Sequence, residues 1–185
     1  MIIERGGEIL YEEEIVPLLP KFLIEEEEGL TGALRGTAYH RFLELLDFTK
    51  NYNYALLKDA VQRFCEEQKM DEEMGRSIRI KDILRFLQSE SGKRMSQCAQ
   101  NGKLFKEQPF VLGLTQSEEL VLVQGIIDVY FEEEDGLVVL DYKTDRVRSA
   151  QELVDKYHAQ LDYYAQALEQ LTEKKVKQKI IYSFT

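Results

Sequence analysis

Cysteine is scarce in this chain, and so are long apolar runs. Its 185 residues include two cysteines, Cys65 and Cys98. Two thiols are too few for a disulfide framework or a four-cysteine iron–sulfur site, so we expect reduced thiols and no iron–sulfur cluster. No apolar run is long enough to span a membrane, and the N-terminus lacks a signal-peptide pattern. We therefore expect a cytoplasmic protein.

Positive charge is also in short supply. The 34 Asp and Glu residues outnumber the 24 Lys and Arg residues, and the formal net charge is −10. This balance argues against a protein that captures nucleic acid unaided, because phosphate binding draws mainly on Lys and Arg. It does not exclude an enzyme to which another protein delivers a strand. The hydrophobic content of 44% predicts a globular chain with one good core.

The most informative stretch is VQGIIDVYFEEEDGLVVLDYKTD, residues 123–145. Two apolar runs, 125–131 and 137–140, flank an acidic turn that ends in Asp135-Gly136. This pattern predicts a β-hairpin, because glycine adopts a positive φ at no steric cost. The hairpin would place charged residues inside or at the end of apolar strands, which is unusual.

Three charged residues of this hairpin are expected to share one face of the sheet. Asp141 and Lys143 are two residues apart on one strand and therefore point to the same side. A two-residue turn at 135–136 places Asp128 opposite Lys143 on that face, and a four-residue loop also keeps it there. A three-residue loop would turn Asp128 to the other face.

Two neighbouring carboxylates in an apolar setting repel each other and are costly to bury. A divalent cation would offset both costs, and oxygen ligands beside a lysine suit Mg²⁺ or Mn²⁺ rather than zinc. An alternative stays open on these residues alone. Asp128 and Lys143 could form a cross-strand ion pair on a solvated face.

The rest of the chain predicts helices followed by a β-β-β-α-β order. Residues 1–30 show no lasting periodicity, so we interpret them as an arm or linker, and 31–185 as the domain, one cut from a longer polypeptide. The expected helices are 38–47 with Thr37 as N-cap, 54–69, 80–89, 92–100 and 150–171; the expected strands are 104–114, 120–131, 137–143 and 177–184. Pro109 marks the first strand as an edge or bulge. This order predicts an α+β fold with a mixed sheet.

Four more polar residues are candidates for a site. His40 lies on the first expected helix, Glu107 in the first expected strand, and Gln160 and Tyr164 lie four apart on the long helix, so their polar ends can reach the same place. Taken singly, each has an ordinary interpretation. His40 and Glu107 could be surface residues, Gln160 could lie at the rim, and Tyr164 could belong to the core.

Taken together, these residues resemble a known family. His40 in GTAYHRFLELLDF, Glu107 in KEQPF, Asp128 in GIIDVY, the triplet Asp141-Tyr142-Lys143 and Gln160 to Tyr164 in QLDYYAQAL occur in this order. The set resembles the RecB-like branch of the PD-(D/E)XK nucleases, and within it the C-terminal nuclease domains of AddA (RexA) helicase–nuclease subunits. The resemblance covers Gly32 to the end. It implies a restriction-endonuclease-like core, a central mixed sheet flanked by helices, with an N-terminal helical extension.

The resemblance also implies roles for individual residues. Metal ligands would be His40, Asp128, Asp141 and the backbone carbonyl of Tyr142, with Mg²⁺ as the cofactor and Mn²⁺ as a substitute. Lys143 would orient or deprotonate the attacking water, Gln160 and Tyr164 would position the strand or the lysine, and Glu107 would be an accessory acid. Ile127 precedes Asp128 where a proline gives the family its name.

The expected function is hydrolysis of phosphodiester bonds in single-stranded DNA, in double-strand break repair and recombination. The expected partners are DNA, a helicase domain in cis that delivers the strand, and a second helicase–nuclease subunit; no membrane is involved. Two alternatives remain. One is a stand-alone PD-(D/E)XK repair nuclease, and the other is an inactive nuclease fold that serves as a docking domain.

Overall fold

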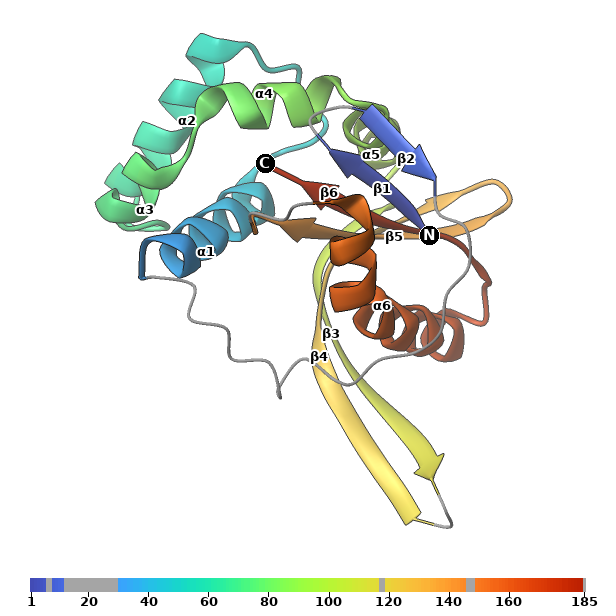
Figure 1. The fold of residues 1–185 in the computed structure, drawn as a ribbon. Coiled ribbons are helices and arrows are strands. Elements are labelled where there is room, and N and C mark those ends of the chain that lie inside the picture. Colours follow the sequence, from blue (N-terminus) through green and yellow to red (C-terminus); the bar gives the residue numbers. More distant parts are fainter. Residues whose placement is uncertain (6–7, 12–29, 117–118, 146–148, 185) are drawn as a thin grey trace.

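A computed structural model describes residues 1–5, 8–11, 30–116, 119–145 and 149–184 (Figure 1). The strands are β1 (Ile2–Arg5), β2 (Glu8–Tyr11), β3 (Leu104–Gln116), β4 (Glu119–Glu133), β5 (Gly136–Lys143) and β6 (Val176–Ser183). The helices are α1 (Leu30–Leu45), α2 (Tyr54–Glu66), α3 (Glu72–Ser77), α4 (Ile80–Gln88), α5 (Glu90–Gln100) and α6 (Ala150–Thr172). Within these residues no helix combines the length and apolarity needed to cross a membrane.

The strands form one mixed sheet in the order β2-β1-β6-β5-β4-β3. β3, β4 and β5 pair antiparallel, and the α6 connection then brings β6 parallel to β5. Connections that return to a parallel strand need such a crossover, and a helix is its usual form. The predicted α+β fold with a mixed central sheet is confirmed.

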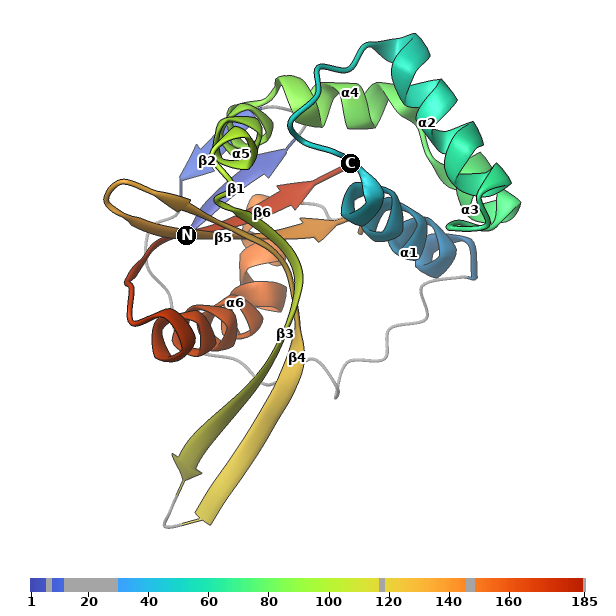
Figure 2. The ribbon, with the colours of Figure 1, turned by 180° about the vertical axis from the view of Figure 1, so that it is seen from behind.

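Helices cover both faces of the sheet (Figures 1 and 2). Along β5 the side chains alternate. Val138, Leu140 and Tyr142 pack into the cluster that includes residues of α1, α2, α4 and α5. Leu137 and Val139 pack on the other side with α6. Because β5 is buried on both faces, its sequence is almost continuously apolar, and charged residues within it require specific partners.

The predicted β4–β5 hairpin is present, but its turn lies one residue earlier than expected. Glu133 pairs with Gly136, and Val129 pairs with Leu140. Continuing this register places Asp128 opposite Asp141, so the expected position opposite Lys143 is wrong. Gly136 has a φ of 146°, and a Cβ there would lie 2.9 Å from the Lys175 carbonyl oxygen, so the position directly after the turn favours glycine. The register shift is two residues, an even number, so the side-chain alternation is unchanged.

β3 and β4 continue well beyond the rest of the sheet. Their pairing runs from Leu104–Phe131 to Gln116–Glu119, whereas β5 follows β4 only as far as Val129. The outer half therefore projects as a two-stranded ribbon (Figures 1 and 2). Pro109 lies on β3, the edge strand, as its missing N–H requires.

Two parts of the chain differ from expectation. Ile2–Arg5 and Glu8–Tyr11 form strands where we expected an extended arm, and β1 joins the sheet by pairing parallel with β6. Four residues are too few to show a periodicity, so these strands depend on pairing; residues 12–29 lie outside the described residues. Helix α1 begins at Leu30 and not after Thr37, whose hydroxyl donates to the Ala33 carbonyl at 3.1 Å within the helix.

Candidate metal centre and active site

The candidate site lies where β4 and β5 separate. Beyond the Val129–Leu140 pair, the Tyr142 N–H donates to Asp128 Oδ2 at 2.9 Å. A side-chain carboxylate thus takes the place of a strand carbonyl at this point of the sheet. Asp128 is 8% exposed, and the hydrogen bond satisfies one buried amide and part of one buried charge.

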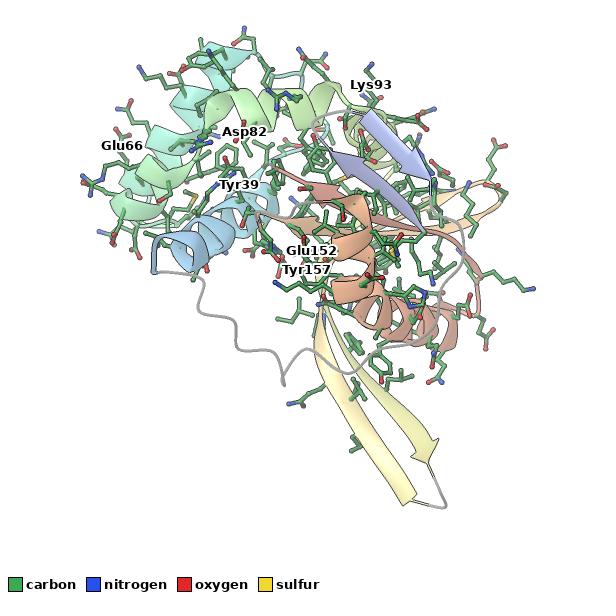
Figure 3. The ribbon with its side chains drawn as sticks, in the orientation of Figure 1. Tyr39, Glu66, Asp82, Lys93, Glu152 and Tyr157 are labelled. Atoms are coloured by element: carbon green, nitrogen blue, oxygen red, sulfur yellow. The ribbon has the colours of Figure 1, made fainter. Side chains whose placement is uncertain are left out.

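Helix α1 brings His40 to the same place. His40 Nδ1 lies 3.3 Å from Asp128 Oδ1, and Nε2 lies 3.0 Å from the Tyr142 carbonyl oxygen. The helix is fixed by its fully buried neighbours Tyr39 and Phe42. The Tyr39 hydroxyl donates to Asp82 Oδ2 of α4 at 2.9 Å, and Figure 3 labels both residues between the two helices.

Glu107 reaches this cluster from β3. Its φ of 50° is unusual for a residue with a side chain, and it lies between two regularly paired residues, Lys106 and Gln108. Such backbone conformations cost about 1–3 kcal/mol and recur at functional sites. One ligand atom each of His40, Glu107 and Asp128 lies within 4.8 Å of the others. Two carboxylate oxygens and one imidazole nitrogen are donors that suit a divalent cation such as Mg²⁺ or Mn²⁺.

The acid and base strengths of the cluster reflect burial and mutual contact. Burial raises the pKa of Glu107, and the nearby Asp128 carboxylate raises it further. For Asp128, burial acts to raise the pKa, but hydrogen bonding to His40 and the charges of His40 and Lys143 lower it overall. For His40, burial acts to lower the pKa, but the contact with Asp128 raises it overall. His40 and Asp128 therefore stabilise each other's charged forms.

Asp141 and Lys143 form a second group beside the first. Lys143 Nζ lies 2.5 Å from Asp141 Oδ2, and both side chains are almost fully buried. The amine also lies 4.3 Å from the centre of the Tyr157 ring and 3.4 Å from Gln160 Oε1, both on α6. Figure 3 labels Tyr157 on this helix.

The α6 contacts continue outward from the lysine. Gln160 Nε2 donates to the Tyr164 hydroxyl at 2.5 Å, so lysine, amide and phenol form one chain of contacts. Burial raises the pKa of Tyr164, which keeps its hydroxyl protonated. The alternative of a cross-strand Asp128–Lys143 ion pair on a solvated face does not fit this geometry: Lys143 contacts Asp141 along β5, Asp128 contacts His40, and both Asp128 and Lys143 are buried.

The structure brings all the sequence-predicted site residues into two adjoining groups. His40, Glu107, Asp128 and the Tyr142 carbonyl form one; Asp141, Lys143, Gln160 and Tyr164 form the other. Asp141 lies outside the trio of mutually close ligand atoms. Their individual roles remain predictions.

Two contacting residues were not singled out from the sequence. Tyr157 lies three residues before Gln160 on α6, a spacing that places both side chains on one side of a helix and was a signal in the sequence. Lys106 adjoins Glu107 in β3, and its ammonium binds the end of α1.

A mixed sheet with an α6 crossover, and acids gathered beside a lysine where two strands part, is the architecture of a PD-(D/E)XK nuclease core. The family model described as the PD-(D/E)XK nuclease superfamily matches residues 11–185, and the chain belongs to this superfamily.

Within this superfamily, the chain is similar to a group of bacterial proteins that share one name. The chain is 39% identical over 92% of its length to the A subunit of an ATP-dependent helicase/nuclease of Lachnoclostridium phytofermentans. It is 35% identical over its full length to the protein of the same name from Clostridium kluyveri, and 36% identical over 92% to that of Clostridium botulinum strain Loch Maree. It spans 16%, 16% and 14% of these proteins, respectively.

Proposed function

We propose that this chain is a divalent-metal-dependent deoxyribonuclease domain that hydrolyses phosphodiester bonds of single-stranded DNA, with exonuclease action. The observation that carries the proposal is the meeting of His40, Glu107 and Asp128 ligand atoms within 4.8 Å, next to the Asp141–Lys143 pair. The relatives are named as A subunits of ATP-dependent helicase/nucleases, which supports an assembly that combines a helicase with a nuclease. We infer that a helicase domain in cis delivers the strand, that a second subunit completes the assembly, and that the assembly serves double-strand break repair and recombination.

His40, Asp128, Asp141 and the Tyr142 carbonyl would hold Mg²⁺, for which Mn²⁺ can substitute, and Glu107 would supply a further oxygen. A bound divalent ion supplies two things, a lowered pKa for water and neutralisation of charge on the phosphate. Burial of the Asp128 and Asp141 carboxylates is costly, and a cation would add to the compensation that the imidazole and ammonium groups give.

The remaining residues would act on the phosphate and the attacking water. Lys143 presents an ammonium that can orient the water and stabilise negative charge as it develops. Gln160 Oε1 accepts from this amine at 3.4 Å, and the Tyr164 hydroxyl accepts from the Gln160 amide, so α6 sets the rotamer of the lysine. The Tyr157 ring also contacts this amine, at 4.3 Å from the ring centre.

The net charge of −10 fits a domain that cleaves DNA but depends on another part of the assembly to bind it. Binding to DNA phosphates gains affinity when Lys and Arg side chains displace the counterions around the DNA. A domain with few such side chains therefore gains little affinity in this way. Capture of DNA would therefore belong to the helicase, and cleavage to this chain.

The test is degradation of end-labelled single-stranded DNA by the chain with Mg²⁺ or Mn²⁺, compared with EDTA. Asp128→Asn keeps an oxygen acceptor for the Tyr142 N–H, so the sheet should persist while cleavage falls by at least about a hundredfold. Asp155→Asn, at an exposed position of α6, is the matched control and should cleave normally. Cleavage by folded Asp128→Asn at the wild-type rate, or cleavage that survives EDTA, would refute the proposal.

A further inference from the structure

The C-terminus of α1 is satisfied by a lysine from another element. α1 itself has no basic residue in its last turn, and its final carbonyl groups have no partners within the helix. Lys106 of β3 places its ammonium among them. Nζ donates to the carbonyl oxygens of Glu44 at 2.5 Å and Leu46 at 2.7 Å, and lies 3.4 Å from that of Leu43. A cation at this end of a helix also interacts favourably with the helix dipole.

This lysine is held in place and not simply directed to solvent. Its ammonium lies 5.4 Å from the centre of the Phe48 ring, and its side chain is half-buried. Burial lowers the pKa of Lys106, while the charges of Glu44, Asp47 and Glu107 act to raise it. A desolvated ammonium with three carbonyl contacts fixes the separation of the two elements more firmly than an exposed ion pair does.

Lys106 joins the two elements that carry two of the candidate ligands. On α1, His40 lies one turn before Glu44, whose carbonyl accepts from Lys106. On β3, Lys106 pairs with Val129 and directly precedes Glu107, the residue with a φ of 50°. A displacement of the strand relative to the helix end would therefore move Glu107 relative to His40.

We propose that Lys106 is a positioning residue of the metal site, whose ammonium ties the end of α1 to β3 and so sets the distance between His40 and Glu107. This inference rests on the proposed function, since it concerns the same site. Lys106 itself contacts neither ligand atom through its ammonium; it acts on them through the helix and the strand.

The test is titration of the whole chain with Mn²⁺ by calorimetry, well below the melting temperature of each variant. Lys106→Met keeps the aliphatic stem and removes the donors. Residues that support metal ligands typically contribute 10–100-fold in affinity, and we expect Mn²⁺ binding to weaken by about tenfold. Lys103→Met is the matched control: its amine is 3.5 Å from Glu132 at the surface, and its Mn²⁺ affinity should equal that of the wild type. Cleavage by Lys106→Met should return to near the wild-type rate at saturating Mn²⁺.

Other outcomes would overturn the inference in different ways. A lowered melting temperature with unchanged Mn²⁺ affinity would make Lys106 a helix cap without influence on the site. Slow cleavage that persists at saturating Mn²⁺ would assign it to the reaction instead of ligand placement. Absence of Mn²⁺ binding to the wild type would reject the proposed function together with the inference. If Lys106→Met does not fold, Lys106→Gln provides the same comparison, since it keeps one donor group and loses the charge.

Discussion

Glu133 ties the end of β4 to α5 and to β6. Its two carboxylate oxygens accept hydrogen bonds from Arg94 Nε at 2.8 Å and Nη2 at 2.9 Å, and Lys177 Nζ lies 2.6 Å away. Substitution of Glu133 by Gln keeps the size of the side chain and removes its charge. A bidentate arginine–carboxylate pair is among the stronger ionic contacts, so this change should lower the free energy of unfolding.

The magnitude can be worked out from the proton affinity of Glu133. Hydrogen bonding from Arg94 lowers its pKa from the ordinary 4.5 to about 2, although burial opposes this and Lys177 assists it. Each tenfold change in proton affinity corresponds to about 1.4 kcal/mol, which gives at most about 3.5 kcal/mol. The side chain is 23% exposed, and solvent screening reduces the expected effect to about 2 kcal/mol.

The assay is urea unfolding of the wild type and Glu133→Gln across a pH series. Because the folded-state pKa is lower than the unfolded one, the stabilisation is complete above about pH 4.5 and is lost as the pH falls through about 2. The difference in unfolding free energy between the two proteins should be about 2 kcal/mol at pH 7. It should fall by more than half at pH 3.

Glu134→Gln is the control, since Glu134 is exposed in the adjoining turn. Its unfolding free energy should stay within about 0.5 kcal/mol of the wild type. A wild-type advantage over Glu133→Gln that is constant from pH 7 to pH 3 would refute the reasoning, because an effect without pH dependence cannot come from the carboxylate charge.

Three further substitutions probe the site and the core. Lys143→Met should reduce cleavage of single-stranded DNA by about a hundredfold or more while Mn²⁺ affinity, measured by calorimetry, changes little; loss of Mn²⁺ binding would place the lysine among the groups that build the metal site. Gly92→Ala should destabilise the chain by about 3 kcal/mol in urea unfolding, since the added Cβ would lie 2.1 Å from the Phe86 carbonyl oxygen; unchanged stability would contradict this close approach. Tyr39→Phe should cost about 1–3 kcal/mol in thermal unfolding because Asp82 loses a donor, and no loss would mean that water replaces the hydroxyl.

The sequence was most informative where periodicity and turn chemistry agree. Helix α6 and strand β5 each differ from their predicted bounds by only one residue. Ser149 caps the start of α6, and Gly136, directly after the turn, is the first residue of β5. The residues of the candidate site were named because their order matches a family, and the structure brings them together. The register of the hairpin was predicted less well, because Asp135-Gly136 is by itself a typical turn pair. In the structure the turn is formed by residues 134–135, and Gly136 follows it, where the Lys175 carbonyl oxygen leaves no room for a Cβ.

Other features depend on contacts that a linear pattern does not show. Strands β1 and β2 are four residues each and exist through pairing with β6 and with each other. Helix α1 extends to Leu30 across Gly36 and Thr37, which resembled a helix start. The Lys106 ammonium binds carbonyl groups about 60 residues away in the sequence, so its contacts could not be predicted from a local pattern. Such long-range hydrogen bonds follow from the packing of a helix end against a strand.

The hydrogen bond from the Tyr142 amide to Asp128 has a consequence for descendants that lose catalysis. A lineage freed from selection for DNA cleavage could replace Lys143 with an apolar residue of similar length. Position 128 would remain constrained, because an amide buried between parting strands still requires an acceptor. Inactive members of such a lineage should therefore vary at position 143 while retaining Asp or Asn at position 128. An Asp at 128 without a lysine at 143 is thus poor evidence of an active enzyme.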